Sequence, residues 1–375
     1  MTRLLVKMPN WVGDCVMATP ALALLKTALP GVSIDLLVRP GVAGILESNP
    51  HKSAIISADD RELPPAVFER LQSSRYDAMA LFTNSMGSAW LAKKLRIPRR
   101  IGFAREWRGP LLTHKIPFHP LEWQTPTPKP LSRRSIKGTP QPGSPRHMVE
   151  YYLEITRATI TALEPAAAAR AQSAGMDYDL VLPLERAAEE KVARLLRENQ
   201  VQGKILIGIN PGAAHGPAKR WPADYLGHAV EILSRPDYAF ISTASPGEAA
   251  LNDAVQAATA APILRLGEKV TLRELPALIS RFSVYITNDS GPMHIAAARR
   301  VPVVAIFGPT DPASTHPWQS PYTLLRNPVP CSPCFLEECP IDHRCMRGIA
   351  PFDAGEAVLQ TLSNNSRWQP MELPR

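Results

Sequence analysis

Short apolar runs alternate with segments of helical periodicity over the first hundred residues. Apolar runs at 4–8, 34–38, 54–57 and 77–82 predict four strands, and a helical pattern at about 14–29 follows the first of them. Nearly continuous apolar strands separated by helices are typical of a parallel sheet that is covered on both faces. The pattern therefore predicts a Rossmann-like domain in the first part of the chain.

The same alternation returns in the second half of the chain. Five further strands are expected, with helical segments between them, at 204–210, 238–244, 263–267, 283–289 and 301–308. The predicted fold class is therefore α/β, with two tandem doubly wound parallel sheets that face each other across a cleft. We place the domains at 1–184 and 185–375, the second ending in a helix, and expect ligands at the carboxyl ends of the strands.

Residues 117–146 interrupt the alternation. This segment holds eight prolines and shows no usable periodicity, and its basic residues include Lys129, Arg133, Arg134 and Lys137. Since a helical pattern resumes at 148–160, we interpret the segment as a long, mobile, basic loop inserted into the first domain.

Composition changes this picture in two respects. Forty-two Lys and Arg against 34 Asp and Glu give a net charge of +8, which favours an anionic partner such as a nucleic acid, a phosphorylated lipid or a nucleotide. No apolar run approaches the roughly 18 residues of a membrane-spanning helix, and Pro9 and Asn10 interrupt the start of the chain before a secretory signal could form. A soluble cytoplasmic protein is therefore expected.

The loop after the first predicted strand reads NWVGD, residues 10–14. Gly13 permits close approach of a ligand to the backbone, and the helix that begins here offers free N–H groups to an anion or a hydroxyl. Asp14 is either a helix-capping residue or a general base that points into the cleft. Neither half contains a GxGxxG fingerprint, which argues against a dinucleotide-dependent dehydrogenase.

The loop NPGAAHGPAKRWP, residues 210–222, follows the first strand of the second half. Gly212 leaves the backbone exposed, and Lys219 and Arg220 place two positive charges at the end of the loop. Backbone N–H groups and such charges together are suited to a phosphate. The alternative is a solvated basic turn before a helix.

A third loop, in TNDSGPMHIAAA at 287–298, joins a strand to a helix. The strand ends at Asp289, and the helix opens at Ser290 and Gly291, an arrangement that suits a diphosphate. Met293 and His294 lie within the first turn; a lone histidine is usually structural, but at this place it is a candidate ligand contact. The last predicted strand ends in FGPTDP (307–312), and loops that converge on one edge are a stronger indication than any one of them.

Four of the five cysteines fall close together near the end of the second half. Cys331, Cys334, Cys339 and Cys345, with His343 among them, are either ligands of a structural metal or the reduced thiols of a cytoplasmic protein. Because their spacing is irregular, we do not favour the metal site.

In this order and spacing, NWVGD, GAAHGPAKRWP, TNDSGPMHIAAA and FGPTDP resemble glycosyltransferase family 9, the ADP-heptose:lipopolysaccharide heptosyltransferases. The resemblance covers about residues 3–350. The segments PAKRWP and CSPC…CPIDHRCM are most similar to the members that add the second inner-core heptose, and members that act on another core acceptor are the alternative. The basic insertion departs from shorter relatives.

The resemblance implies a GT-B enzyme that inverts configuration in one displacement, without a cofactor or a protein-held metal. The first domain would bind the acceptor and the second the donor, ADP-heptose. Asp14 would take the proton of the acceptor hydroxyl, Lys219 would bind the donor diphosphate, and Glu248 would hold the ribose. The donor-binding residues would be Gly13, Gly212, Arg220, Glu248, Asp289, Ser290, Gly291, Met293 and His294, and the acceptor-binding residues would include Asn10, Trp11 and Arg105.

The acceptor implied in this way is heptosyl-Kdo2–lipid A, at the cytoplasmic face of the inner membrane. Seven cations of the first domain suit the anionic groups of such a lipid or the anionic bilayer, with a solvated basic face as the plain alternative: Lys93, Lys94, Arg96, Arg99, Arg100, Arg105 and Arg108. Two rival classes are a two-lobed RNA-binding protein and a metal or redox module built on the cysteines. The chain lacks an RRM signature, a KH loop and interleaved basic and aromatic strands, so we expect no nucleic-acid partner.

Overall fold

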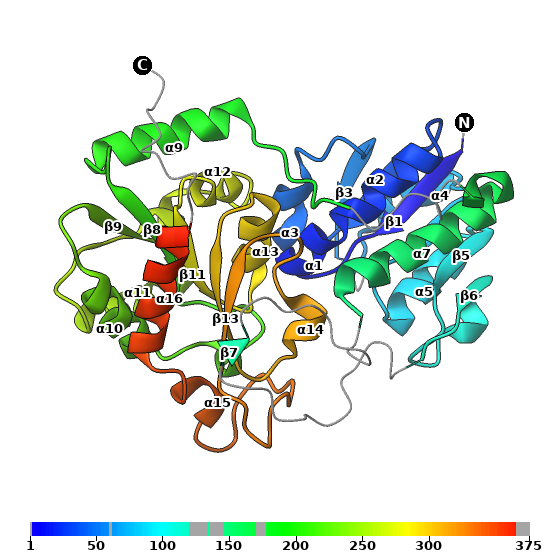
Figure 1. The fold of residues 1–375 in the computed structure, drawn as a ribbon. Coiled ribbons are helices and arrows are strands. Elements are labelled where there is room, and N and C mark those ends of the chain that lie inside the picture. Colours follow the sequence, from blue (N-terminus) through cyan, green and yellow to red (C-terminus); the bar gives the residue numbers. More distant parts are fainter. Residues whose placement is uncertain (1, 60–61, 120–133, 136–145, 170–177, 365–375) are drawn as a thin grey trace. The chain divides into compact units, whose positions relative to one another are not determined.

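The computed structural model describes residues 2–59, 62–119, 134–135, 146–169 and 178–364. Contacts between residues divide the chain into two compact units, one of residues 1–123 and 146–183 and the other of residues 124–145 and 184–375. Each unit is built around one sheet (Figure 1).

The first unit contains a six-stranded sheet in which all strands are parallel. The strand order is β3-β2-β1-β4-β5-β6, which reverses direction between β1 and β4 as in a Rossmann fold. The strands are β1 (Arg3–Lys7), β2 (Ser33–Val38), β3 (Ala54–Ser57), β4 (Ala78–Leu81), β5 (Arg99–Phe103) and β6 (His114–Ile116). The first four confirm the sequence prediction. The last two were missed because β5 opens with two arginines and β6 is short, with an exposed histidine and lysine.

Helices cover both faces of this sheet (Figure 1). Apolar side chains of α4 (Pro65–Ser73) and α5 (Met86–Lys94) pack with those of β1 and β4 in one buried cluster. On the other face, α2 (Thr19–Ala28) packs against α7 (Met148–Leu163), which contacts β4 and β5.

The helix expected at about 14–29 is in fact two helices, α1 (Val12–Met17) and α2. Pro20 at the start of α2 has no N–H to donate to the Val16 carbonyl one turn earlier. The Thr19 hydroxyl donates to that carbonyl instead, at 2.7 Å. The break lets the chain turn while this buried carbonyl keeps a hydrogen-bond partner.

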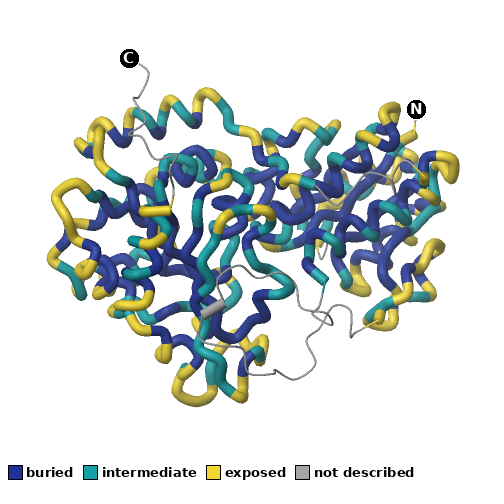
Figure 2. Tube along the Cα trace, viewed as in Figure 1, coloured by how far each residue is buried: buried dark blue, intermediate teal, exposed yellow. Residues whose placement is uncertain are grey.

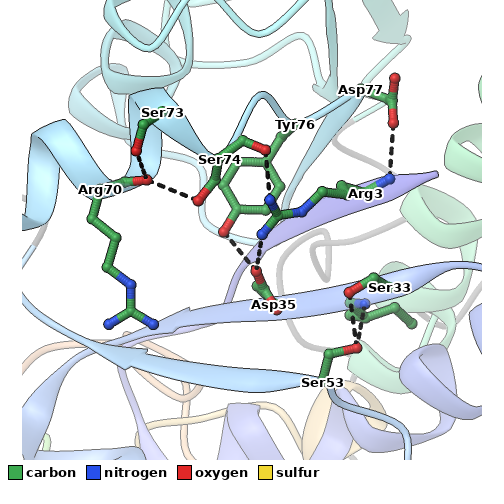
Figure 3. A network of polar contacts seen from close by, with 10 residues as sticks. Arg3, Ser33, Asp35, Ser53, Arg70, Ser73, Ser74, Tyr76 and Asp77 are labelled. Carbon is green, nitrogen blue, oxygen red and sulfur yellow. Dashed lines mark hydrogen bonds and ion pairs between the residues drawn. The ribbon is translucent and has the colours of Figure 1, made fainter. Parts of the chain in front are cut away.

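A polar network fastens the amino ends of the strands in the first unit (Figure 3). Arg3 donates its backbone N–H to Asp77 Oδ2 and a guanidinium N–H to the Ser74 carbonyl, both at 2.8 Å. Asp35 Oδ2 lies 3.3 Å from Arg3 Nη2 and accepts a hydrogen bond from the Tyr76 hydroxyl at 2.7 Å. Ligands of doubly wound sheets bind at the opposite ends of the strands, so we assign this network a structural role.

The second unit repeats the topology of the first. Its sheet has the order β10-β9-β8-β11-β12-β13-β7, and the six strands from β10 to β13 follow the Rossmann pattern again. They are β8 (Ile205–Asn210), β9 (Tyr238–Ser242), β10 (Ile263–Leu264), β11 (Val284–Asn288), β12 (Val303–Phe307) and β13 (Tyr322–Arg326). All five predicted strands are confirmed, although β10 is only two residues long.

Two helical layers enclose this second sheet. On one face, α10 (Ala223–Leu233) packs against α11 (Ala249–Ala257) and α16 (Pro351–Asn364), and apolar side chains of α10 and α16 join the core beside β8, β11 and β12. A further helix, α12 (Leu275–Ile279), packs against both α9 (Arg186–Glu198) and α13 (Gly291–Ala298). Figure 2 shows the strands of both sheets largely buried and the outer helix turns exposed.

One part of the proline-rich segment departs from its expected place. Arg134 and Ser135 form the strand β7, which pairs antiparallel with Leu325 and Leu324 of β13. This part therefore belongs to the second sheet and not to a loop of the first domain, because the free edge of β13 offers backbone groups for pairing. Residues 120–133 and 136–145, with Lys129, Arg133 and Lys137, lie outside the described residues.

Among the described helices, none is both long enough and apolar enough to cross a membrane.

Candidate functional site

The candidate loops lie where the strand order of each sheet reverses. In the first unit, residues 10–14 follow β1, which pairs with β2 on one side and β4 on the other. In the second unit, the loops at 211–222 and 289–291 follow β8 and β11, which pair with each other. Each loop is thus at the carboxyl edge where doubly wound sheets bind ligands.

In the first unit, Asp14 is held by a tyrosine from a distant helix. Asp14 lies in the first turn of α1, and its Oδ1 accepts a hydrogen bond from the hydroxyl of Tyr152 in α7, at 2.9 Å. Burial and then the negative charge of Asp14 raise the pKa of Tyr152 well above its ordinary value. Tyr152 therefore stays protonated, and it fixes one carboxylate oxygen of Asp14 as a hydrogen-bond donor.

A buried lysine holds the loop that precedes Asp14. Lys7 is fully buried, and its ammonium donates to Asn10 Oδ1 and the Met8 carbonyl, both at 3.3 Å. Gly13 is buried, whereas Trp11 is half exposed. Asn10 thus serves to shape the loop, and Trp11 presents its ring at the edge of the sheet.

Cys15, next to Asp14, is a packing residue. Its thiol is buried and donates to the Pro9 carbonyl at 3.3 Å. Burial, followed by the charge of Asp14, raises the pKa of the thiol far above its ordinary value. A thiol in this state is not a nucleophile.

The basic cluster of the first unit is only partly a surface feature. Arg108 is fully buried and donates to the Phe103 and Thr83 carbonyls and to Asn84 Oδ1, so the prediction that it binds an anion is wrong. Its guanidinium instead satisfies backbone carbonyls, and burial lowers its pKa to about 10.

Arg100 and Arg105 are also engaged within the protein. Arg100 donates to the Ile97 and Leu111 carbonyls at 2.7 Å each. Arg105 lies 3.6 Å from Glu106, with its guanidinium 4.3 Å above the Phe118 ring. Of these two, only Arg105 is placed at the carboxyl edge of the sheet, where it follows β5.

In the second unit, two buried asparagines join the loops that follow β8 and β11. Asn210 donates to Gly212 O, Thr287 Oγ1 and Ser290 Oγ at 3.0 to 3.2 Å. Asn288 donates to the backbone carbonyls of residues 210–212 and accepts from the Trp221 N–H at 3.0 Å. The two loops are therefore held as one rigid edge.

Lys219 and Asp289 meet at this edge as a buried ion pair. Lys219 Nζ lies 2.7 Å from Asp289 Oδ2, which also accepts the Thr310 hydroxyl at 2.7 Å. Burial alone would raise the pKa of Asp289, but the charge and hydrogen bond of Lys219, aided by Thr310, hold it below its ordinary value. The arrangement keeps a cation and an anion fixed side by side at the carboxyl ends of β8 and β11.

His294 is buried beside this pair, in α13. Burial lowers its pKa to about 4 against the opposing effect of Asp289, so the ring is neutral near pH 7. Its Nδ1 is buried and has no hydrogen-bond partner in the described part of the chain. Ser290 occupies the N-cap position of the same helix, without a side-chain capping hydrogen bond, and Gly291 is its first residue, as expected; Met293 is fully buried.

Glu248 lies directly against the backbone of Gly212. A Cβ at residue 212 would come within 2.0 Å of Glu248 Oε1, so the Glu248 carboxylate could keep this position only beside a glycine. Glu248 Oε2 accepts hydrogen bonds from the Ser245 N–H and hydroxyl, at 3.0 and 2.8 Å, which fixes the carboxylate. Arg220, at the end of the loop, reaches the Ala213 carbonyl at 3.5 Å.

Residues 331–345, which hold four of the five cysteines and are called the cysteine segment below, contact the turn that carries Lys219. The Glu337 carbonyl accepts from the Ala218 N–H at 2.9 Å, and His343 Nε2 lies 2.7 Å from the Ala218 carbonyl. All five cysteines of the chain are free thiols, and burial followed by its three cysteine neighbours raises the pKa of Cys345 to about 11. Among the described residues, no three His, Cys, Asp or Glu side chains are grouped so as to hold a metal ion.

Tyr152, Thr310 and the two asparagines were not predicted as site residues. Their contacts join positions that are far apart in the sequence, such as 14 and 152 or 289 and 310. FGPTDP had been noted as a polar strand end, which was a usable signal for Thr310. No local pattern marks Tyr152 as the partner of Asp14.

A family model described as glycosyltransferase family 9 (heptosyltransferase) matches residues 132–344. The chain is 27% identical over 361 residues to lipooligosaccharide heptosyltransferase 2 of Campylobacter jejuni subsp. jejuni (strain 81116), covering 95% of this chain and 98% of that protein. It is 26% identical over 339 residues to lipopolysaccharide heptosyltransferase 2 of Escherichia coli K12, covering 86% and 88% respectively.

The structural comparison agrees with this match. The structure of E. coli ADP-heptose LPS heptosyltransferase II superposes with a TM-score of 0.75 at 23% sequence identity, covering 97% of this chain and 99% of that one. This similarity confirms the fold class expected from the resemblance, GT-B with two Rossmann-like parallel sheets.

Proposed function

Because the chain belongs to glycosyltransferase family 9, the heptosyltransferases, and is a glycosyltransferase, we propose that it acts as heptosyltransferase II. In this role it transfers L-glycero-D-manno-heptose from ADP-heptose to the first heptose of the lipopolysaccharide inner core. The names of the two relatives above support the choice of this step. The observation that carries the proposal is the buried Lys219–Asp289 pair at the reversal point of the second sheet.

The donor half of the reaction is assigned to the second unit. As the bond to ADP breaks, negative charge grows on the departing diphosphate, which Lys219 and the N–H groups at the start of α13 stabilise more strongly in the transition state than in the ground state. Glu248, which lies against the buried backbone of Gly212, offers carboxylate oxygens to the ribose hydroxyls. We assign Asp289 and the neutral His294 hydrogen bonds to the sugar.

The acceptor half is assigned to the first unit. Asp14 takes the proton of the attacking hydroxyl, and Tyr152 orients it for that task. An aspartate is a weak base, so the proton moves late, when attack on the anomeric carbon has made the hydroxyl acidic. Asn10, Trp11 and Arg105 surround the acceptor on the same edge. The reaction needs neither a cofactor nor a metal.

The proposed acceptor, heptosyl-Kdo2–lipid A, places the enzyme at the cytoplasmic face of the inner membrane. The acceptor is anionic, and so is that membrane surface, which agrees with the net charge of +8. No nucleic acid is assigned as a partner.

The test is transfer from ADP-heptose to two acceptors, Kdo2–lipid A and its monoheptosylated form, by the wild type, Asp14→Ala and Asp14→Asn. We expect turnover on the monoheptosylated acceptor alone and a loss of at least 100-fold in both variants, since a positioned base contributes about 10²- to 10⁴-fold. Turnover on Kdo2–lipid A would assign the first heptosyl step instead. Tight ADP binding with no transfer to either acceptor would refute the acceptor assignment.

A further inference from the structure

The outward face of α5 carries apolar side chains where a surface helix normally has polar ones. Residues 88, 89, 91 and 92 are buried, so the opposite side of the helix faces solvent. That side begins with Met86, 42% exposed, and Trp90, 46% exposed, one turn apart. Lys93 and Lys94 complete it, and Lys93 Nζ lies 5.3 Å from the centre of the Trp90 ring.

A second tryptophan is displayed by the loop that follows β5. Trp107 is 92% exposed, and both Glu106 and Trp107 adopt left-handed backbone conformations, with φ of 52° and 63°. Non-glycine residues rarely take this conformation, and two in succession need support from their surroundings. The buried Arg108 gives that support, because its guanidinium binds the Phe103 and Thr83 carbonyls and Asn84.

These two features belong to one side of the first unit. β4 and β5 are parallel neighbours, and α5 and the Trp107 loop follow their carboxyl ends. Arg108 ties the loop to residues 83 and 84, just before α5, and α5 contacts the short helix η2 (Gly109–Leu111) that follows the loop. β1, which carries Asp14 at its carboxyl end, is the neighbour of β4 in the same sheet.

The exposed charges beside these side chains are mainly positive. Lys93, Lys94, Arg96 and Lys115 are exposed, and the one acidic residue between positions 86 and 119, Glu106, is paired with Arg105 at 3.6 Å. Exposed tryptophans together with lysines are the combination that binds the interface of an anionic bilayer, where the ring lies among the headgroups and the cations meet lipid phosphates.

We propose that Met86, Trp90, Lys93, Lys94 and Trp107 form the surface through which the protein lies on an anionic lipid bilayer. This rests on the proposed function, in which the acceptor is a lipid of that bilayer. The surface then brings the edge that carries Asp14 to the headgroup region, where the inner-core sugars are exposed. Trp107 works as a rigid anchor because its loop is held by Arg108.

The first test measures binding to vesicles that contain no acceptor. Co-sedimentation with phosphatidylethanolamine–phosphatidylglycerol vesicles is compared with pure phosphatidylcholine vesicles, for the wild type, Trp90→Ser/Trp107→Ser and Lys93→Gln/Lys94→Gln. The matched control is Phe352→Ser, which removes an aromatic side chain that is 65% exposed in the second unit. We expect both double variants to bind the anionic vesicles at least tenfold more weakly and the control to bind like the wild type. Equal binding by all four proteins would overturn the proposal.

The second test separates membrane docking from catalysis. Transfer is measured on the acceptor embedded in the same vesicles and on a de-acylated, water-soluble acceptor. We expect the tryptophan variant to lose at least tenfold in rate on the embedded acceptor and to match the wild type on the soluble one. An equal loss on both acceptors would assign the tryptophans to the acceptor site and refute the membrane surface. If the wild type transfers to neither acceptor, the proposed function fails, and vesicle binding alone still decides the surface.

Discussion

At the scale of single residues, the candidate donor site depends on one buried pair of opposite charges, Lys219 and Asp289. Asp289 is nearly inaccessible, and a carboxylate in such a place is tolerated only when a partner compensates for the lost water. Lys219 is that partner, and the Thr310 hydroxyl satisfies the same oxygen. The two residues implied for diphosphate and sugar therefore also stabilise the fold of the second unit.

Replacing Lys219 alone should be costlier for stability than replacing both members of the pair. Lys219→Met leaves the Asp289 carboxylate unpaired and should lower the free energy of unfolding by about 3 kcal/mol, whereas Lys219→Met/Asp289→Asn should recover most of that loss. Transfer should be lost in both. Urea unfolding and initial rates measure the two effects, and equal stability of the single and double variants would contradict a compensated pair.

His294 should make the stability of the protein depend on pH. Its pKa is about 4 in the folded protein and about 6.5 in the unfolded chain, so between these values only the unfolded chain binds the proton. The stabilisation is complete above about pH 6.5 and falls with pH, by about 2 kcal/mol between pH 7 and pH 5. Urea unfolding at both pH values should show this loss in the wild type and a smaller one in His294→Asn; identical losses would refute the assignment.

Tyr152 should act on catalysis through Asp14. Tyr152→Phe removes one hydrogen bond to a charged group, and we expect kcat to fall roughly tenfold while KM for the acceptor changes little. The acid limb of the kcat profile should move to higher pH, because the charged form of Asp14 loses a donor. A fall in stability with an unchanged pH profile would indicate a packing role only.

At the scale of elements, the turn that carries Lys219 is positioned by the cysteine segment. Gly216 has a φ of 157°, and a Cβ there would lie 2.4 Å from the Glu337 carbonyl oxygen. The same carbonyl binds the Ala218 N–H, so the two segments meet backbone to backbone. This contact gives the cysteine segment a supporting role beside Lys219.

Gly216→Ala should therefore displace the Lys219 turn. We expect transfer to fall at least tenfold and the protein to lose about 2 kcal/mol of stability, since both backbone strain and a clash are introduced. Gly41→Ala is the matched control, because a Cβ at residue 41 meets nothing within 4 Å. If the two variants behave alike in rate and in urea unfolding, the close contact is not what requires glycine.

The apolar pattern predicted the strands that are buried on both faces, such as β1, β8 and β12, and the loops that follow them. It missed β5, β6 and β13, whose residues are partly polar because they lie toward one edge of a sheet. Arg108 looked like a surface cation because its sequence context is basic, and only tertiary structure supplies the carbonyls that it binds. Tyr152 has the same explanation, since its partner lies 138 positions away.

At the scale of the whole molecule, one topology is used twice for two tasks. Both sheets reverse direction at the same place, between β1 and β4 and between β8 and β11, and each puts its candidate loops there. The first carries the proposed base and the second the proposed donor site, so each ligand would have a unit of its own.

ADP should therefore protect one unit selectively. A ligand that binds only the folded state stabilises the elements that hold it. In the full-length protein, hydrogen exchange with saturating ADP should slow in the loops after β8 and β11 and stay unchanged in β1 to β6. Lys219→Met should abolish the effect. Equal protection of both sheets, measured by mass spectrometry, would contradict a donor site built mainly by the second unit.

The short strand β7 bears on whether the second sheet can aggregate with other copies of the protein. A sheet edge displays unpaired N–H and carbonyl groups, which can recruit a strand of another chain and start aggregation. Arg134 and Ser135 occupy this position along Leu324 and Leu325 of β13. A two-residue strand that includes an arginine is itself a poor template for further strands. β7 thus occupies the edge of β13 and disfavours pairing of the second sheet with a strand of another copy.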